Sequence, residues 1–164
     1  MPNLSKYLPL PRILLDVDVT SKKRLFEQIG LVFENENRIP RAQVFEALFA
    51  REKLCSTGLG LGVAIPHGRI KGLRDTLAVF IRCKTAIPFD AQDGVPVRLV
   101  LAMLVPSHAT EQHLGMLSTL AQMFSDPSLR EALLAAETAE TVQHLLTEWT
   151  PYQAHATAHR STTI

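Results

Sequence analysis

The amino-acid sequence predicts an α/β (α+β) sandwich, in which a mixed central sheet is flanked by helices on both faces. Apolar residues recur at helical spacing in several segments, and short runs rich in β-branched residues lie between these segments. Residues 97–105 are almost continuously apolar, which is typical of a strand covered on both faces. These patterns place helices and strands in one layered domain but do not give the order of the strands.

The N-terminal half is predicted to contain one strand followed by two helices. Residues 13–17 form a short apolar run and are the predicted strand. Thr20 or Ser21 can cap the next helix, because a side-chain oxygen there accepts a hydrogen bond from a free backbone N–H. A second helix is expected from about residue 41 to residue 53. The inward positions expected in the two helices are Leu25, Phe26, Ile29, Val32, Phe33, Val44, Phe45, Leu48 and Phe49.

The C-terminal half is predicted to contain two strands and then three helices. Residues 77–83 are the first of these strands, and Asp93-Gly94 marks a tight turn before the apolar strand described above. Residues 109–124 show a strong helical stripe. Asp126 and Pro127 suit the cap and first turn of a helix over 127–135, and Thr138 begins the last helix.

Composition and length indicate one domain, and the cysteines indicate a protein of a reducing compartment. The chain has 164 residues, of which 46% are hydrophobic, and this is enough for one full core. We expect a single domain over residues 5–150 and a flexible tail over 151–164, where periodic apolar residues are missing. The two cysteines form no framework pattern and are expected to be thiols, with Cys55 a small buried residue.

The charge balance argues against several classes of partner. The formal net charge is +1, so no global field attracts nucleic acid or a membrane surface. The longest apolar run, residues 99–105, is far shorter than a membrane span, and the N-terminus lacks the layout of a secretory signal. We therefore expect a cytoplasmic protein that binds no nucleic acid and does not insert into a membrane.

The most unusual stretch is residues 56–70, which read S-T-G-L-G-L-G-V-A-I-P-H-G-R-I and hold four of the eight glycines. Nucleotide binding in the two common modes is unlikely on motif grounds. The dinucleotide fingerprint requires a third glycine where Val63 or Ile65 stands, and the P-loop requires a lysine and a hydroxyl after its last glycine, where Val63 and Ala64 stand. No cofactor is expected.

One histidine, His67, lies within this stretch. Residues 63–65 are expected to form a short strand that ends at Pro66-His67-Gly68, so that His67 stands at the strand end with little side-chain bulk beside it. This setting suits an imidazole that meets a side chain of another protein. An ordinary turn with an ordinary histidine remains the alternative from the spacing alone.

Other polar residues provide weaker signals. Arg51 ends the second predicted helix, and its planar guanidinium could hold two phosphate oxygens. His113 begins the helix over 109–124 and could equally be a half-buried residue bonded to backbone. A metal site built from His67, His108, His113 and an aspartate lacks any H-x-x-x-H or H-E-x-x-H spacing, so no metal is expected. A serine hydrolase is disfavoured because no G-x-S-x-G is present.

Three segments resemble the fructose/mannitol-type enzyme IIA proteins of the bacterial phosphotransferase system. They are R-E-K-L-C-S-T-G-L-G-L-G-V-A-I-P-H-G over residues 51–68, P-F-D-A-Q-D-G-V-P-V over 88–97, and L-V-P-S-H-A-T-E-Q-H-L over 104–114. The resemblance covers roughly residues 5–149 and is greatest to the nitrogen-regulatory branch. It implies a mixed sheet sandwiched by helices.

The resemblance also implies roles for particular residues. His67 matches the histidine that accepts a phosphoryl group from a histidine phosphocarrier protein, forming a transient phosphohistidine. His113 matches the second active-site histidine, which donates a hydrogen bond to the phosphoryl group, and Arg51 matches the arginine that stabilises it. The expected binding surface consists of Gly58, Gly60, Gly62, Pro66 and Gly68.

Three functions remain open at this point. Nitrogen-regulatory members bind other proteins according to phosphorylation state, and the lack of a fused transport or carrier domain favours this function. A sugar-specific enzyme IIA would instead pass the group to a cysteine of a separate enzyme IIB. A binding module that kept the fold but lost phosphotransfer is the alternative of another class.

Overall fold

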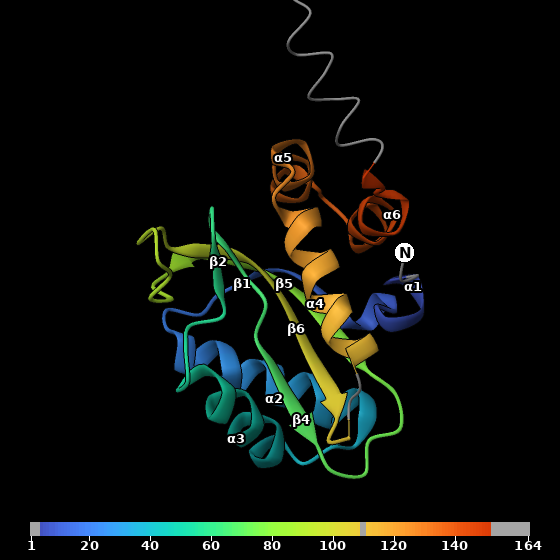
Figure 1. Cartoon of the computed structure of the whole chain (residues 1–164). Coiled ribbons are helices and arrows are strands. Elements are labelled where there is room, and N and C mark those ends of the chain that lie inside the picture. The colour runs from blue at the N-terminus through green and yellow to red at the C-terminus, as the bar shows by residue number, and fades with distance from the viewer. Residues whose placement is uncertain (1–3, 109–110, 152–164) are drawn as a thin grey trace, which may run out of the picture.

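Six strands form one mixed sheet between two layers of helices (Figure 1). The computed structural model describes residues 4–108 and 111–151, and the side chains of residues 111–114 fall outside that description. The strands are β1 (Ile13–Val17), β2 (Gly58–Gly60), β3 (Val63–Ala64), β4 (His67–Ile70), β5 (Leu77–Ile87) and β6 (Val97–Pro106). Their order is β1-β5-β6-β3-β2, and β4 pairs with β6 beyond the end of β3. Strand β5 is antiparallel to β6, whereas β3 and β4 are parallel to β6, so the sheet is mixed.

Helices cover both faces of this sheet, which confirms the predicted sandwich. The helices are α1 (Leu4–Tyr7), α2 (Lys22–Asn37), α3 (Arg41–Glu52), α4 (Glu111–Phe124), α5 (Pro127–Ala135) and α6 (Ala139–Glu148), with a 3-10 turn, η1, at Leu10–Arg12. Helices α2 and α3 pack on one face, and α4, α5 and α6 pack on the other (Figure 1). Each face therefore has its own hydrophobic core.

Strand β6 shows why one segment can be apolar throughout. Its side chains alternate between the two faces, as the pleat of a strand requires. Leu101 and Met103 contribute to the core under α4, α5 and α6, whereas Ala102 and Leu104 contribute to the core under α2 and α3. The continuous apolar run over residues 97–105 is therefore a strand buried on both faces, as predicted.

Local sequence signals set the starts of three helices. The Ser21 hydroxyl accepts a hydrogen bond from the Arg24 N–H at 3.1 Å, so Ser21 is the cap of α2. Asp126 caps α5 by accepting from the Ser128 N–H at 3.0 Å, and Thr138 caps α6. The predicted caps and the predicted bounds of α5 are confirmed.

The glycine-rich stretch is more regular than the sequence suggests. A β2–β3 hairpin forms within it, and Gly60 and Gly62 flank the hairpin tip with φ of 86° and 81°, values that favour glycine. The expectation that His67 ends a strand was wrong, because β3 stops at Ala64 and His67 begins β4. Proline has no N–H to donate, so Pro66 bonds to β6 only through its carbonyl, which accepts from the Met103 N–H at 2.9 Å, and the regular pairing resumes at His67.

One strand is longer than expected, and the predicted tail falls almost entirely outside the described residues. Strand β5 continues four residues beyond the predicted end at Cys83, and residues 84–86 of this extension are exposed. The predicted tail lies outside the described residues from residue 152 onward. Within the described part of the chain, no helix has the length and apolar character needed to cross a membrane.

Candidate functional site

His67 is held at the start of β4 by a contact to its own chain. Its ring atom Nδ1 lies 3.0 Å from the carbonyl oxygen of Ile65. A carbonyl oxygen can only accept a hydrogen bond, so Nδ1 of the neutral ring must carry the proton. The second ring nitrogen, Nε2, is then left with a free lone pair. The backbone thus fixes both the orientation of the imidazole and the nitrogen that can act as a nucleophile.

The neighbour of His67, Gly68, allows α3 to approach β4 closely. A Cβ atom at Gly68 would lie 2.8 Å from the carbonyl carbon of Ala47 and 2.9 Å from its Cβ atom. The backbone of α3 cannot move aside as a flexible side chain could. Gly68 and Ile70 face α3 and the core behind it, so His67 and Arg69 point to the other side of the sheet.

Replacing Gly68 with alanine is expected to destabilise the protein by about 1–3 kcal/mol, because the added methyl group overpacks the contact with Ala47. Urea unfolding of the purified protein measures this loss. Gly115, an exposed residue of α4, is the matched control, because a Cβ added there would meet no atom of the described neighbours within 4 Å. Gly115→Ala should raise stability by about 0.5–1 kcal/mol, since alanine suits a helix better than glycine. Equal stability of Gly68→Ala and the wild type would contradict the close approach.

The surroundings of His67 keep its imidazole neutral. Burial lowers the pKa of His67 below its ordinary value, and the positive charges of Arg51 and Arg69 lower it further. The Ile65 carbonyl and the negative charge of Glu52 act in the opposite direction but do not cancel the effect. Near neutral pH the ring is therefore uncharged, and Nε2 is available.

An NMR titration of the His67 ring protons is expected to give a midpoint below 6.5. Because the folded pKa lies below the unfolded one, the unfolded chain binds more protons between the two values. The contribution of His67 to stability should therefore rise with pH across that window and be constant above it. The same titration in concentrated urea supplies the unfolded reference. A midpoint at or above 6.5 in the folded protein would contradict the described environment.

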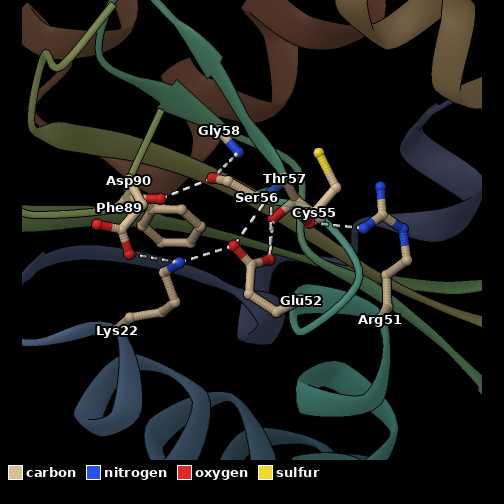
Figure 2. A network of polar contacts seen from close by, with 9 residues as sticks. All are labelled: Lys22, Arg51, Glu52, Cys55, Ser56, Thr57, Gly58, Phe89 and Asp90. Carbon is tan, nitrogen blue, oxygen red and sulfur yellow. Dashed lines mark hydrogen bonds and ion pairs between the residues drawn. The ribbon is translucent and has the colours of Figure 1, made fainter. Parts of the chain in front are cut away.

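Arg51 lies in the last turn of α3 and is half-buried. Its Nη1 atom donates to the carbonyl oxygen of Cys55 at 2.7 Å, and Figure 2 shows the rest of the guanidinium extending away from this contact. The fold brings Arg51 close enough to His67 for its charge to lower the histidine pKa. The structure thus places together two of the three residues that the sequence singles out.

The third residue, His113, lies within α4, but its side chain is outside the described part of the structure. Its role therefore stays a prediction. His108 is exposed in the turn after β6. Among the side chains that the structure describes, those of residues 4–108 and 115–151, no three or more His, Cys, Asp or Glu are grouped to hold a metal ion.

The proposed binding surface is less accessible than the sequence suggests. Gly60, Pro66 and Gly68 are buried, whereas Gly58 and Gly62 are half-buried. A Cβ at Gly58 would lie 2.9 Å from the Cβ of Ala91, so this glycine also serves internal packing. These residues shape the chain around His67, and only Gly58 and Gly62 have appreciable surface to offer a partner.

The expectation that Cys55 is buried was wrong, because its side chain is exposed. Cys55 lies in the turn that follows α3, where its carbonyl oxygen accepts the hydrogen bond from Arg51. Figure 2 shows the thiol directed away from the polar network. Its main-chain oxygen, and not its sulfur, contributes to the site.

Sequence reasoning missed a buried carboxylate beside Arg51. The side chain of Glu52 is only 4% exposed and forms an ion pair with Lys22 at 2.8 Å (Figure 2). It also accepts hydrogen bonds from the backbone and the hydroxyl of Thr57. One signal was present in the sequence: Glu52 continues the inward stripe of Val44 and Leu48 at four-residue spacing.

Comparison with known proteins identifies the family of this chain. Residues 6–149 match the family model described as "Phosphoenolpyruvate-dependent sugar phosphotransferase system, EIIA 2". The nitrogen regulatory protein of Pseudomonas aeruginosa is 40% identical over 149 residues, which cover 90% of this chain and 97% of that protein. The fructose-specific EIIA component of Haloferax volcanii is 33% identical over 147 residues, covering 89% and 96% of the two chains.

A solved structure gives the same result. The crystal structure of the nitrogen regulatory protein IIA-Ntr from Neisseria meningitidis superposes with a TM-score of 0.84 and is 53% identical, covering 88% of this chain and 99% of that one. The family match spans most of the chain, and both protein relatives are matched over nearly their full length. The chain therefore belongs to the EIIA type 2 family of the phosphoenolpyruvate-dependent sugar phosphotransferase system.

Proposed function

We propose that this protein accepts a phosphoryl group on Nε2 of His67 from a histidine phosphocarrier protein and binds regulated partners according to its phosphorylation state. The observation that carries this proposal is the contact of Nδ1 with the Ile65 carbonyl, which leaves Nε2 as the nucleophile. The lowered pKa of His67 supports it, because a neutral ring is needed for attack on phosphorus.

The transfer requires positioning and charge stabilisation. The lone pair of Nε2 attacks phosphorus as the bond between phosphorus and the donor nitrogen breaks, and that electron pair returns to the donor ring. Nδ1 keeps its proton throughout, and the Ile65 carbonyl stabilises the positive charge that develops on the ring. Arg51 would stabilise the phosphoryl oxygens, and His113 would donate a hydrogen bond to them. The step as written requires no metal or nucleotide.

The regulatory role follows from the charge that the modification adds. A phosphoryl group brings nearly two negative charges and new acceptor oxygens to a half-buried position. A partner that closely covers unmodified His67 would then have to desolvate this charge. The names of the nitrogen regulatory relatives, matched over nearly their full length, favour this role.

A second candidate is a sugar-specific enzyme IIA that passes the phosphoryl group to a cysteine of a separate enzyme IIB. The observation in its favour is the fructose-specific EIIA relative, which is 33% identical over 96% of its length. The two functions share the chemistry at His67 and differ in the acceptor.

Intact mass spectrometry tests the proposal. The protein is incubated with phosphoenolpyruvate, enzyme I and a histidine phosphocarrier protein, with a known enzyme IIA as a positive control. We expect one phosphoryl group, lost in acid as a phosphohistidine would be. No added mass on a folded protein, beside a labelled control, would leave only a binding module.

A second measurement separates the two candidates. Phosphorylated and unmodified protein, each immobilised, are compared for capture of purified regulatory partners and for transfer to a purified enzyme IIB. The regulatory role predicts partner binding that changes with phosphorylation and no rapid transfer. Rapid labelling of an enzyme IIB cysteine, with partner binding independent of phosphorylation, would favour the sugar-specific function.

A further inference from the structure

A polar network under the site connects α2, α3 and the start of the glycine-rich stretch (Figure 2). Glu52 is its centre. One carboxylate oxygen lies 2.8 Å from Nζ of Lys22, and the other accepts from the Thr57 hydroxyl at 2.6 Å. The Thr57 N–H also donates to the carboxylate, at 3.1 and 3.2 Å from its two oxygens. Thr57 is buried, so both of its donors depend on Glu52.

The network continues from Thr57 to the imidazole through the backbones of Thr57 and Ile65. The carbonyl oxygen of Thr57 accepts a hydrogen bond from the Ile65 N–H at 3.0 Å. The carbonyl oxygen of the same Ile65 residue accepts from Nδ1 of His67, also at 3.0 Å. The next carbonyl, that of Pro66, accepts from the Met103 N–H of β6 at 2.9 Å. Ile65, whose carbonyl sets the tautomer of His67, is therefore anchored through its N–H by Thr57, and the following Pro66 is anchored through its carbonyl by the sheet.

Further contacts hold the segment from Ser56 to Gly58 and the residues around it. The Ser56 hydroxyl donates to the Phe89 carbonyl at 2.6 Å and accepts from the Gly58 N–H at 3.1 Å. Lys22 lies 4.7 Å from the centroid of the Phe89 ring and 3.5 Å from the Asp90 carboxylate. The segment from Ser56 to Gly58 is thus held by the Glu52 side chain and by the Phe89 backbone carbonyl, and Lys22 contacts both of these residues.

A buried ion pair is a weak source of net stability, because two charges must be removed from water. What it can supply is one defined arrangement of the groups around it. The carboxylate of Glu52 imposes such an arrangement on Thr57, whose peptide leads to Ile65 and so to His67. Three successive hydrogen bonds, through the backbones of Thr57 and Ile65, thus link the buried carboxylate of Glu52 to the imidazole of His67.

We propose that Glu52, with Lys22 and Thr57, is a positioning unit that fixes the Ile65 carbonyl and thereby holds His67 with Nδ1 protonated and Nε2 presented to the phosphoryl donor. None of the three residues touches the phosphoryl group. The effect of this positioning unit on the rate of phosphorylation rests on the proposed phosphocarrier function, whereas its effect on the imidazole tautomer does not.

A matched pair of substitutions at Thr57 tests the unit. Thr57→Val keeps the shape and the backbone N–H but removes the hydroxyl that donates to Glu52, whereas Thr57→Ser retains that hydroxyl. We expect Thr57→Val to slow single-turnover phosphorylation of His67 by about two- to tenfold, the equivalent of one lost hydrogen bond. Thr57→Ser should lie within about twofold of the wild type, and Glu52→Gln should be slower than Thr57→Val because it also removes the buried ion pair with Lys22.

The decisive readout is the tautomer of His67, followed by the ¹⁵N chemical shifts of its two ring nitrogens in unphosphorylated protein. Thr57→Val and Glu52→Gln should increase the fraction of ring with the proton on Nε2, and Thr57→Ser should not. Val142→Ala, which removes core volume under α6 on the other side of the sheet, controls for a general loss of stability. Glu34→Gln, which breaks the more exposed ion pair with Arg41, controls for the loss of a carboxylate.

The outcomes separate this inference from the proposed function. A wild-type protein that is phosphorylated, with an unchanged tautomer in Thr57→Val and Glu52→Gln, would overturn the positioning unit alone. An altered tautomer in those variants supports the unit even if no phosphoryl group is accepted by the wild type. Equal changes in Val142→Ala would mean that the effect reflects stability, and the unit would be rejected.

Discussion

Replacing His67 with asparagine is expected to abolish phosphoryl uptake while leaving the fold intact. The asparagine amide nitrogen can occupy the place of Nδ1 and donate to the Ile65 carbonyl, so the local contact is kept. The variant has no counterpart of Nε2, and no other group at that position can attack phosphorus. Intact mass after incubation with phosphoenolpyruvate, enzyme I and the histidine phosphocarrier measures the loss.

The control for this variant is His144→Asn, the same change at an exposed histidine of α6. It should take up one phosphoryl group as the wild type does. Circular dichroism and the midpoint of thermal unfolding show whether each variant is folded. A folded His67→Asn protein that still gains an acid-labile phosphoryl group would place the acceptor elsewhere.

Arg51→Met is expected to reduce the rate of phosphorylation by about tenfold to 150-fold. This range corresponds to the loss of one charge-assisted hydrogen-bonding partner of the phosphoryl oxygens in the transition state. The substitution also removes the contact with the Cys55 carbonyl, which holds the turn after α3. Single-turnover labelling with excess phosphorylated carrier gives the rate of the step itself.

Two comparisons isolate the role of the guanidinium. Arg51→Lys keeps the positive charge but not the planar fork, and its rate should lie between those of the wild type and Arg51→Met. Arg24→Met removes an exposed arginine of α2 that pairs with Glu27 and should leave the rate unchanged. If Arg51→Met reacts as fast as Arg24→Met, the arginine has no part in the transfer.

Much of the fold could be predicted because its signals are local. Asp126 and Pro127 give a cap and a first turn in adjacent residues, so the bounds of α5 were predicted correctly. The buried strand β6 was visible as an apolar run because both of its faces are covered. Neither signal depends on knowing which elements pair.

The elements that escaped prediction depend on distant partners. Strands β2 and β4 contain glycine, histidine and arginine, which have weak strand preferences, and they form because β3 and β6 offer hydrogen bonds. The burial of Glu52 requires Lys22, which lies thirty residues earlier, as well as Thr57. A charged residue at a helix end is usually solvated, so its sequence neighbours alone do not indicate a buried network.

The site itself was partly within reach of the sequence. The glycine-rich stretch singled out His67, and the family resemblance added Arg51, which the packing of α3 against β4 then brings near it. The state of the imidazole was not predictable from sequence, because it depends on the Ile65 carbonyl, in a segment that is held by contacts with Thr57 and with β6. The proposal that Nε2 is the reactive nitrogen therefore rests on the structure and not on the sequence.

The most direct test of this account is to identify the atom that carries the phosphoryl group. Protein labelled with ¹⁵N at histidine is phosphorylated, and the coupling of ³¹P to the ring nitrogens of His67 is measured by NMR. The account predicts a bond to Nε2, with Nδ1 still protonated and bonded to the Ile65 carbonyl. Phosphorus attached to Nδ1, or to any residue other than His67, would contradict it.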